Sequence, residues 1–410
     1  MIGPFVGCAA AQTIQSGWYG VAGASTSSFT FVDAAGTSFV QTIGSGVGGT
    51  ISPGTSQSIL HLPNDPDVFL IGGFGFVGEA RLTSATTVTY TVLTNGIGAA
   101  SQMSRDGVGN LWIADSWVGQ VRRVAPNGTV TDMSIGPQPW GNGLNAGVYE
   151  PATGDFVAGG NGALFRLVAA TTVAVPLVAG LGGSVSAVDV DPCTGELLAA
   201  VLAPANRLVL VDANSNVKDL ITPGAITGPN GIAVDHDGNF VTGDQNGDLW
   251  VVDRLTGVPT RVAVAAVGGT VTGVAATRLV GDGQACAFGS PCGPGAALPW
   301  LRSSGPYRVG ATVTTRSVNH QPGAFGSAIL GLAALPQPFN LDPLLGTAGC
   351  LQYVDTLAVA TVFADPAGVM VFPLGVTASM GGLTVFLQHL ALDGAGLADV
   401  TVSNGLALSF

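Results

Sequence analysis

The stretch PNGIAVDHDGNFVTGD (residues 229–244) decides the fold, because it contains an apolar strand, an acidic turn and a second apolar strand. An earlier stretch, MSRDGVGNLWIAD (residues 103–115), has the same order. Aligned on the turn, the copies are marked by Asp65, Asp106, Pro151, Asp191 and Asp235. The first two markers are 41 residues apart and the last two are 44 apart. Because a period of about 40 to 45 residues is typical of one four-stranded blade, the repeat predicts a β-propeller.

The two ends of the repeat region predict how the propeller closes. Residues 270–276 form a lone apolar strand after the last full copy, and residues 17–43 supply three strands without an inner partner. One sheet built from both ends removes the unpaired edges that an open array would expose. We therefore expect a six-bladed β-propeller over residues 12–282, closed by N-terminal strands that join residues 270–280. Five or seven blades remain alternatives, because one copy is split.

Composition supports an all-β chain and excludes some partners. Glycine accounts for 62 of the 410 residues, and only 9% of residues are charged. Alternating segments such as residues 86–92 recur, without a sustained helical stripe. The net charge of -12 and the scattered basic residues argue against nucleic acid, because phosphate binding needs clustered Lys and Arg. The sequence has no run of 18 apolar residues and so predicts no membrane span.

The repeat stops after Gly281, where the composition changes. Residues 283–299 are rich in Cys, Gly and Pro, and we expect them to form a linker. Residues 300–410 then contain short apolar segments separated by turns such as residues 365–368. This pattern predicts a small antiparallel β-sandwich after the propeller.

The N-terminus and the cysteines indicate export. Residues 1–11 end in small residues, and we expect them to be the remnant of an export signal that contains Cys8. We favour a disulfide between Cys292 and Cys350, which would contribute roughly 4 kcal/mol in the chain-entropy model. Cys193 would then pair with Cys286, although a Cys286–Cys292 pair is an alternative. Disulfides imply an oxidising compartment, and we expect the protein to be extracellular or at the cell surface.

Two resemblances extend this interpretation. Residues 103–115 and 229–244 resemble NHL repeats and, more loosely, the six-bladed gluconolactonase and regucalcin group. Residues 286–410, with FGSPCGPG (residues 288–295) and VSNGLAL (residues 402–408), resemble a C-terminal module found on exported proteins of planctomycete-type bacteria. That module implies a surface or secreted address and no chemistry.

The gluconolactonase resemblance implies a divalent metal in the central channel, held by a Glu, by an Asn in a Pro-Asn-Gly context and by an Asp. Asn230 has this context, and Asn142 or Asn145 occupies the equivalent place two blades earlier. The three glutamates are expected on outer strands or turns, and without a channel carboxylate metal activation of water loses its electrostatic basis. Asp235 and Asp237 resemble half of a calcium loop, but such residues also build tight turns between strands.

Other candidate residues favour binding over catalysis. The four histidines are distributed over both expected domains, and the sequence has no Gly-x-Ser-x-Gly elbow that would expose a serine. It therefore predicts no catalytic triad. We expect His389 on a solvent or interface face. Trp117 and Trp140 lie beside loops, where they would stack on a sugar or peptide, or else pack in the core.

The sequence therefore predicts a non-catalytic, secreted or cell-surface protein that uses an NHL-like propeller as a binding or structural scaffold. We expect a protein or glycan partner rather than a small molecule, no nucleic acid and no cofactor. The alternative is a divalent-metal-dependent, lactonase-like hydrolase with calcium or another divalent cation in the propeller channel. Fold alone does not choose between them.

Overall fold

A computed structural model describes most of the chain, namely residues 18–23, 28–33, 38–42, 56–62, 67–84, 87–134, 138–140, 143–267, 269–277, 282–293, 297–345, 349–394 and 399–410. The chain divides into two compact units. The first contains Met1–Asp235 and Asn239–Val280, and the second contains His236–Gly238 and Gly281–Phe410. The described residues are all-β apart from two very short helices in the second unit.

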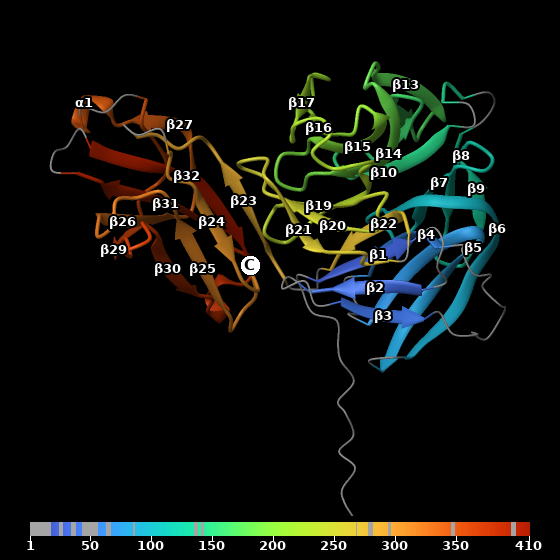
Figure 1. Cartoon of the computed structure of the whole chain (residues 1–410), viewed down its shortest axis with the longest axis horizontal. Coiled ribbons are helices and arrows are strands. Elements are labelled where there is room, and N and C mark those ends of the chain that lie inside the picture. Colours follow the sequence, from blue (N-terminus) through green and yellow to red (C-terminus); the bar gives the residue numbers. More distant parts are fainter. Residues whose placement is uncertain are drawn as a thin grey trace, which may run out of the picture. The chain divides into compact units, whose positions relative to one another are not determined.

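The first unit is built from antiparallel sheets, seen in blue to yellow in Figure 1. One sheet has the order β22-β1-β2-β3 (Val271–Ala276, Tyr19–Gly23, Ser28–Val32, Ser38–Thr42). The next is β4-β5-β6-β7-β8-β9 (Ser56–His61, Val68–Ser84, Thr87–Arg105, Leu111–Asp115, Gln120–Val124, Val130–Asp132). Three more follow: β10-β11-β12-β13 (Leu144–Glu150, Asp155–Gly160, Ala163–Val168, Val173–Val178), β14-β15-β16-β17 (Gly183–Val190, Leu197–Pro204, Arg207–Val211, Val217–Asp219) and β18-β19-β20-β21 (Asn230–Val234, Phe240–Gly243, Leu249–Val252, Pro259–Ala263).

The first sheet joins the two ends of the repeat region. In it β1 pairs with β22, and Tyr19 lies opposite Ala276 while Val21 lies opposite Val274. The innermost strands lie against one another in the order β22, β4, β6, β10, β14 and β18, and β18 lies against β22 again. This closed ring, with sheets radiating from it, is the arrangement of a β-propeller.

The acidic turns of the repeat explain why neighbouring strands reverse direction. In the turn between β18 and β19, Asp235 Oδ1 accepts a hydrogen bond from the backbone N–H of Asn239 at 2.8 Å. Gly238 has a φ of +82°, which a residue with a Cβ adopts only at a cost. The turn therefore needs both residue types, an oxygen acceptor first and a glycine three positions later.

The second unit contains two main sheets. The larger has the order β23-β32-β31-β26-β29 (Gln284–Phe288, Val400–Ser409, Thr384–Leu392, Phe325–Gly331, Ala358–Phe363), and the smaller is β24-β25-β30 (Leu301–Ser304, Thr312–Ser317, Met370–Gly375). A pair, β27-β28 (Ala334–Asn340, Leu351–Val354), and the short helices α1 (Asp342–Leu345) and η1 (Ala378–Met380) complete it. Both main sheets contribute to one core, which includes Leu301, Val313, Leu387 and Leu406. None of the helices in the described part of the chain is long and apolar enough to cross a membrane.

The prediction of a linker at residues 283–299 is wrong for residues 284–288. Residues 284–288 form β23, which pairs with β32 along its whole length, from Gln284 opposite Ser409 to Phe288 opposite Gly405. Ala285 is 1% exposed and packs in the core. A short apolar strand is hard to recognise between Gly-rich segments, because its pairing partner lies more than a hundred residues further along the chain.

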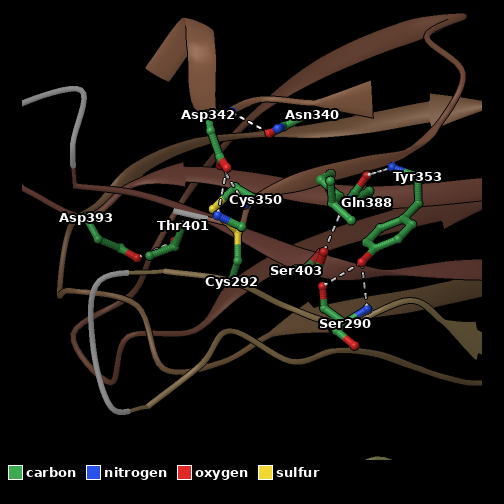
Figure 2. The surroundings of a disulfide bond; sticks show 12 residues. Ser290, Cys292, Asn340, Asp342, Cys350, Tyr353, Gln388, Asp393, Thr401 and Ser403 are labelled. Carbon is green, nitrogen blue, oxygen red and sulfur yellow. Dashed lines mark hydrogen bonds between the residues drawn. A yellow bond between two sulfur atoms is a disulfide. The ribbon is translucent and has the colours of Figure 1, made fainter. Parts of the chain in front are cut away.

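A disulfide fastens the second unit beside β27 and β28 (Figure 2). Cys292 and Cys350 form the bond that the sequence favoured, and it spans 58 residues of sequence. Both cysteines pack with Leu341, Val400 and Val402. Cys193 and Cys286 are also disulfide-bonded cysteines.

Candidate binding surface and channel

The innermost strands of the first unit surround a cavity of about 350 Å³. Most of its lining residues are small or apolar and come from these strands. The polar and charged members of the described lining are Ser58, His61, Ser101, Gln102, Ser104, Arg105, Tyr149, Ser186, Asp189 and Thr272. The channel is therefore close to neutral, with one acid and one arginine in its lining.

Much of the polar lining is used to join blades. Gln102 on β6 donates from Nε2 to the carbonyl of Val188 on β14 at 2.5 Å, and its Oε1 accepts from the N–H groups of Gly147 and Val188 at 2.9 and 3.0 Å. Ser104 Oγ accepts from the N–H of Tyr149 at 2.7 Å. These contacts hold three neighbouring inner strands together.

Asp189, which the sequence interpretation missed, is the carboxylate in the channel lining. Its Oδ2 accepts from the N–H of Val234 at 3.2 Å, and its Oδ1 accepts from the N–H of Val190 at 2.8 Å. Its position two residues before the turn marker Asp191 was the available signal, because this part of each repeat lies on the innermost strand. The carboxylate is occupied in linking β14 to β18.

Of the asparagines predicted for the channel, Asn145 and Asn230 lie among the described residues, and both make other contacts. Asn230 begins β18, but its Oδ1 accepts from the N–H of Gly231 at 3.1 Å and it is not part of the cavity lining. Asn145 Nδ2 donates to Ser184 Oγ at 3.1 Å, which joins β10 to β14. Asn142 lies outside the described residues. Glu150 ends the inner strand β10, contrary to expectation, but its carboxylate pairs with Arg166 at 2.7 Å.

The weak metal candidates Asp235 and Asp237 have hydrogen-bond partners within the protein. Asp235 is 2% exposed and accepts from Tyr19 Oη at 3.3 Å in addition to its turn contact. Asp237 belongs to the second unit, where Tyr307 Oη donates to it at 2.7 Å, and burial raises the pKa of Asp237 to about 6. Among the described residues, no three His, Cys, Asp or Glu side chains are grouped so that they would hold a metal ion.

The two predicted binding tryptophans have opposite surroundings. Trp140 is fully buried, donates from Nε1 to the carbonyl of Gly119 at 2.9 Å and contacts Phe165 edge-on, so it is a core residue. Trp117 is 71% exposed. Its ring meets Phe74, itself 42% exposed, in an edge-on contact with 6.0 Å between ring centroids. We call Phe74 and Trp117 the aromatic pair.

A buried carboxylate fixes the loop that carries Trp117. Asp115 is fully buried and accepts from the N–H groups of Gly98 and Ala99 at 2.7 and 2.8 Å. Arg122 Nη1 lies 3.3 Å from the same carboxylate. A Cβ on Gly98 would approach the Trp117 Cβ to 2.7 Å, so only glycine fits beside this loop. Buried contacts of Asp115 therefore hold the loop that carries Trp117.

The second unit contains a hydrogen-bonded Ser, His and Asp that the sequence did not predict. His320 Nε2 contacts Ser317 Oγ, and His320 Nδ1 lies 3.2 Å from Asp393 Oδ2. Asp393 also accepts from Thr401 Oγ1 (Figure 2). Although the order of contacts resembles a catalytic triad, Ser317 is fully buried, so no substrate reaches its hydroxyl. We interpret the group as a structural link between strands.

Known proteins resemble this chain in sequence over one short segment and in structure over a longer part. The family described as "Strictosidine synthase-like, N-terminal" matches residues 218–252. A crystal structure of a nidogen/laminin complex matches with 11% identity and a TM-score of 0.52, over 64% of this chain and 99% of that chain. Virginiamycin B lyase from Staphylococcus aureus matches with 10% identity and a TM-score of 0.41, over 78% and 95%. A Bacteroides thetaiotaomicron protein of unknown function matches with 13% identity and a TM-score of 0.43, over 65% and 70%.

No curated protein matches the chain in sequence. At 11% identity, the similarity to the nidogen/laminin structure shows the fold alone. Together with the closed ring of inner strands, it identifies the first unit as a β-propeller.

Proposed function

We propose that this protein is a non-catalytic, secreted or cell-surface binding protein, with a six-bladed, NHL-like propeller as its scaffold and a small β-sandwich after it. The first half of the long strand β6 pairs with β5 and its second half pairs with β7. We therefore count the sheet from β4 to β9 as two blades that share β6, which gives six blades in all. The disulfide supports an extracellular address, because such bonds persist in oxidising compartments.

The observation that carries the proposal is the exposure of Trp117 next to Phe74. Tryptophan is enriched among the residues that dominate binding interfaces, since it buries a large area at a small entropic cost. Its indole also stacks on sugar rings and still offers an N–H donor. We therefore propose that the aromatic pair is the centre of the contact with a protein or glycan partner.

The support beneath the pair strengthens this proposal. Asp115 holds the backbone at Gly98 and Ala99, and the N–H of Ser116 donates to the carbonyl of Ala99 at 3.0 Å. Ser116 Oγ further accepts from Ser101 Oγ at 2.6 Å. A loop ordered before binding loses less entropy when the partner arrives, which favours affinity.

The test compares Trp117→Ala with wild type in binding to insoluble cellulose, chitin and peptidoglycan, and to an extracellular protein fraction. We expect Trp117→Ala to weaken the binding that wild type shows by about tenfold or more, since such residues contribute at least about 2 kcal/mol. Val108→Ala is the matched control, because Val108 is 80% exposed on another turn of the same sheet. Equal binding by wild type and Trp117→Ala would contradict the proposal.

The lactonase-like alternative is less well supported by the donor set. It needs several oxygen or nitrogen ligands that converge in the channel, whereas the described lining supplies one carboxylate, Asp189, whose two oxygens accept backbone N–H groups. Calcium, zinc and manganese titrations of chelator-treated protein, with Asp189→Asn beside wild type, separate the two functions. A cation-specific rise in the thermal midpoint that Asp189→Asn abolishes would favour the hydrolase.

A further inference from the structure

Strand β6 bulges beside the aromatic pair. Phe76 of β5 pairs with Asn95, and Phe74 pairs with Ala99. Three residues of β6 therefore lie opposite a single residue of β5. Gly98, the last of the three, lies directly beside Trp117, since a Cβ on it would approach the Trp117 Cβ to 2.7 Å. Bulges of this kind change the direction of side chains, often next to a site. Residues 95–98 therefore form one side of the surface around the aromatic pair.

Glycines keep this surface low beside the aromatic rings. Gly75 follows Phe74 and has a φ of +83°, and Gly96 follows Asn95 and has a φ of +90°. A Cβ at either position would meet no atom within 4 Å, so both positions border open space. Positive φ favours glycine. As a result, no side chain rises beside the rings at these two positions, and a long, flat molecule has room to lie across them.

Hydroxyl and amide groups lead from Trp117 to the channel. Ser116 precedes Trp117, and its Oγ lies 2.6 Å from Ser101 Oγ. Gln57 Oε1, on β4, lies 3.5 Å from the same Ser101 oxygen. Ser101 is itself part of the cavity lining. On the other side of the aromatic pair, Asn95 is exposed, and its side chain makes no hydrogen bond to the described residues. These groups are uncharged, and each type can both donate and accept hydrogen bonds.

The charged residues beneath this surface have partners within the protein. Asp115 is fully buried, and Arg122 Nη1 lies 3.3 Å from its carboxylate. Arg122 also pairs with Asp132 at 3.1 Å and donates to the carbonyl of Gly96. The hydrogen-bonding groups that surround the aromatic pair and face a partner are therefore the uncharged amides and hydroxyls.

We propose that the aromatic pair binds an uncharged polysaccharide, an inference that deepens the proposed function and rests on it. One sugar ring stacks on Trp117, and the hydroxyls of neighbouring sugars hydrogen-bond to Asn95, Ser116 and Gln57. A sugar hydroxyl both donates and accepts, and so do these amide and hydroxyl side chains. The chain has a net charge of -12, which neither attracts nor repels a neutral polysaccharide.

A protein partner matches this surface less well. Stable protein interfaces bury about 800 Å² on each partner, and aromatic residues and arginines in packed pockets dominate their affinity. Beside the aromatic pair, Gly75 and Gly96 offer no side chains to such an interface, and two carboxylates engage Arg122. A polysaccharide needs only a stacking ring and hydrogen-bonding groups along a narrow track.

The experiment titrates the full chain with four uncharged hexaoses in a calorimeter: those of β-linked glucose, β-linked N-acetylglucosamine, β-linked mannose and α-linked glucose. We expect at least one to bind, and the comparison among them identifies the sugar. Its affinity should be the same at low and high salt, because no charges meet across the contact. Trp117→Ala should lower the affinity by about tenfold or more, and Asn95→Ala and Gln57→Ala by about threefold each.

Asn214→Ala is the matched control for Asn95→Ala, because Asn214 is an exposed asparagine on the turn between β16 and β17, and it should leave the affinity unchanged. The inference is overturned if wild type binds none of the four hexaoses, if salt weakens the binding, or if Asn214→Ala and Asn95→Ala lower the affinity equally. The salt series on wild type keeps the test valid should a variant fail to fold.

The same measurements distinguish failure of this inference from failure of the proposed function. A protein that binds wild type and is lost in Trp117→Ala, while no hexaose binds, would leave the proposed function standing and overturn the polysaccharide. Equal binding of every partner by wild type and Trp117→Ala would contradict both.

Discussion

The turn carboxylates of the first unit bind residues close in sequence, whereas the buried polar groups of the second unit bind residues far apart in sequence. Asp106 accepts from the N–H groups of Val108 and Asn110 at 3.1 and 2.8 Å, and from Trp112 Nε1 at 3.1 Å. Asp244 repeats this pattern two, four and six residues onward. In the second unit, His320 and Asp393 are 73 residues apart. The first pattern stabilises local turns, whereas the second holds distant strands together.

This comparison explains which region depends on tertiary structure for its polar contacts. A turn carboxylate keeps most of its partners whenever the turn forms, because all of them lie within six residues. The cluster in the second unit exists only when β25 and β31 are both in place. Loss of one long-range contact should therefore cost more than loss of one turn contact.

The largest expected loss of stability comes from Asp115, a residue of the first unit whose contacts are long-range. Asp115 lies in the first unit, yet it is fully buried and binds residues 16 and 17 positions away as well as Arg122. Asp115→Ala leaves two N–H groups and a partly buried guanidinium without this acceptor, and we expect it to lower the free energy of unfolding by about 3 to 5 kcal/mol. Urea denaturation followed by tryptophan fluorescence measures the loss.

The control for Asp115 is Asp132, which pairs with the same Arg122 at 3.1 Å but has a side chain that is 53% exposed. Asp132→Ala should cost at most about 1 kcal/mol, because solvent screens exposed ion pairs. Equal losses in the two variants would show that burial does not set the size of the effect at this arginine.

The disulfide gives the next largest effect and sharpens the comparison, since it is confined to the second unit. Replacing Cys292 and Cys350 by Ser removes a cross-link that spans 58 residues, and the expected loss of stability is roughly 2 to 4 kcal/mol. Hydrogen exchange should become faster in β27, β28 and β32 and remain unchanged in β10 to β21. Uniformly faster exchange in both units would contradict this assignment.

Sequence reasoning succeeded where the physical signal is local. The acidic turns predicted a propeller because each one places an acceptor and a glycine at fixed spacing, as Asp235 and Gly238 show. The favoured Cys292–Cys350 pairing is confirmed. The place of Trp117 and Trp140 beside loops left either role open for each of them, because only the folded structure buries Trp140 in the core and leaves Trp117 exposed.

The failures share one cause, which is pairing between distant strands. His389 was expected on a solvent or interface face, yet it is fully buried on β31, which lies between β26 and β32 inside the larger sheet. The role of Gln102 in joining β6 to β10 and β14 likewise depends on strands 45 and 86 residues away. An isolated segment contains no information on which strands will cover its faces.

The smallest expected effect is a loss of stability at acid pH, and His389 is the residue that causes it. Burial, and secondarily the charge of nearby His320, lowers the pKa of His389 to about 3. In the unfolded chain its pKa is about 6.5, so the unfolded state binds more protons between these two values. The stability that His389 contributes is therefore complete above pH 6.5 and is lost as pH falls toward 3, with a loss of about 2 kcal/mol by pH 5.

The window from pH 7 to 5 separates His389 from Asp393. Hydrogen bonds from His320 and Thr401 hold the pKa of Asp393 below its usual value despite partial burial, so its carboxylate stays charged throughout this window. His389→Leu should remove most of the pH dependence of unfolding of the second unit between pH 7 and 5, measured by urea denaturation at each pH with hydrogen exchange to assign the unit. If the pH dependence persists in His389→Leu, another group of the second unit takes up the proton, and the buried imidazole of His389 does not cause the loss of stability between pH 7 and 5.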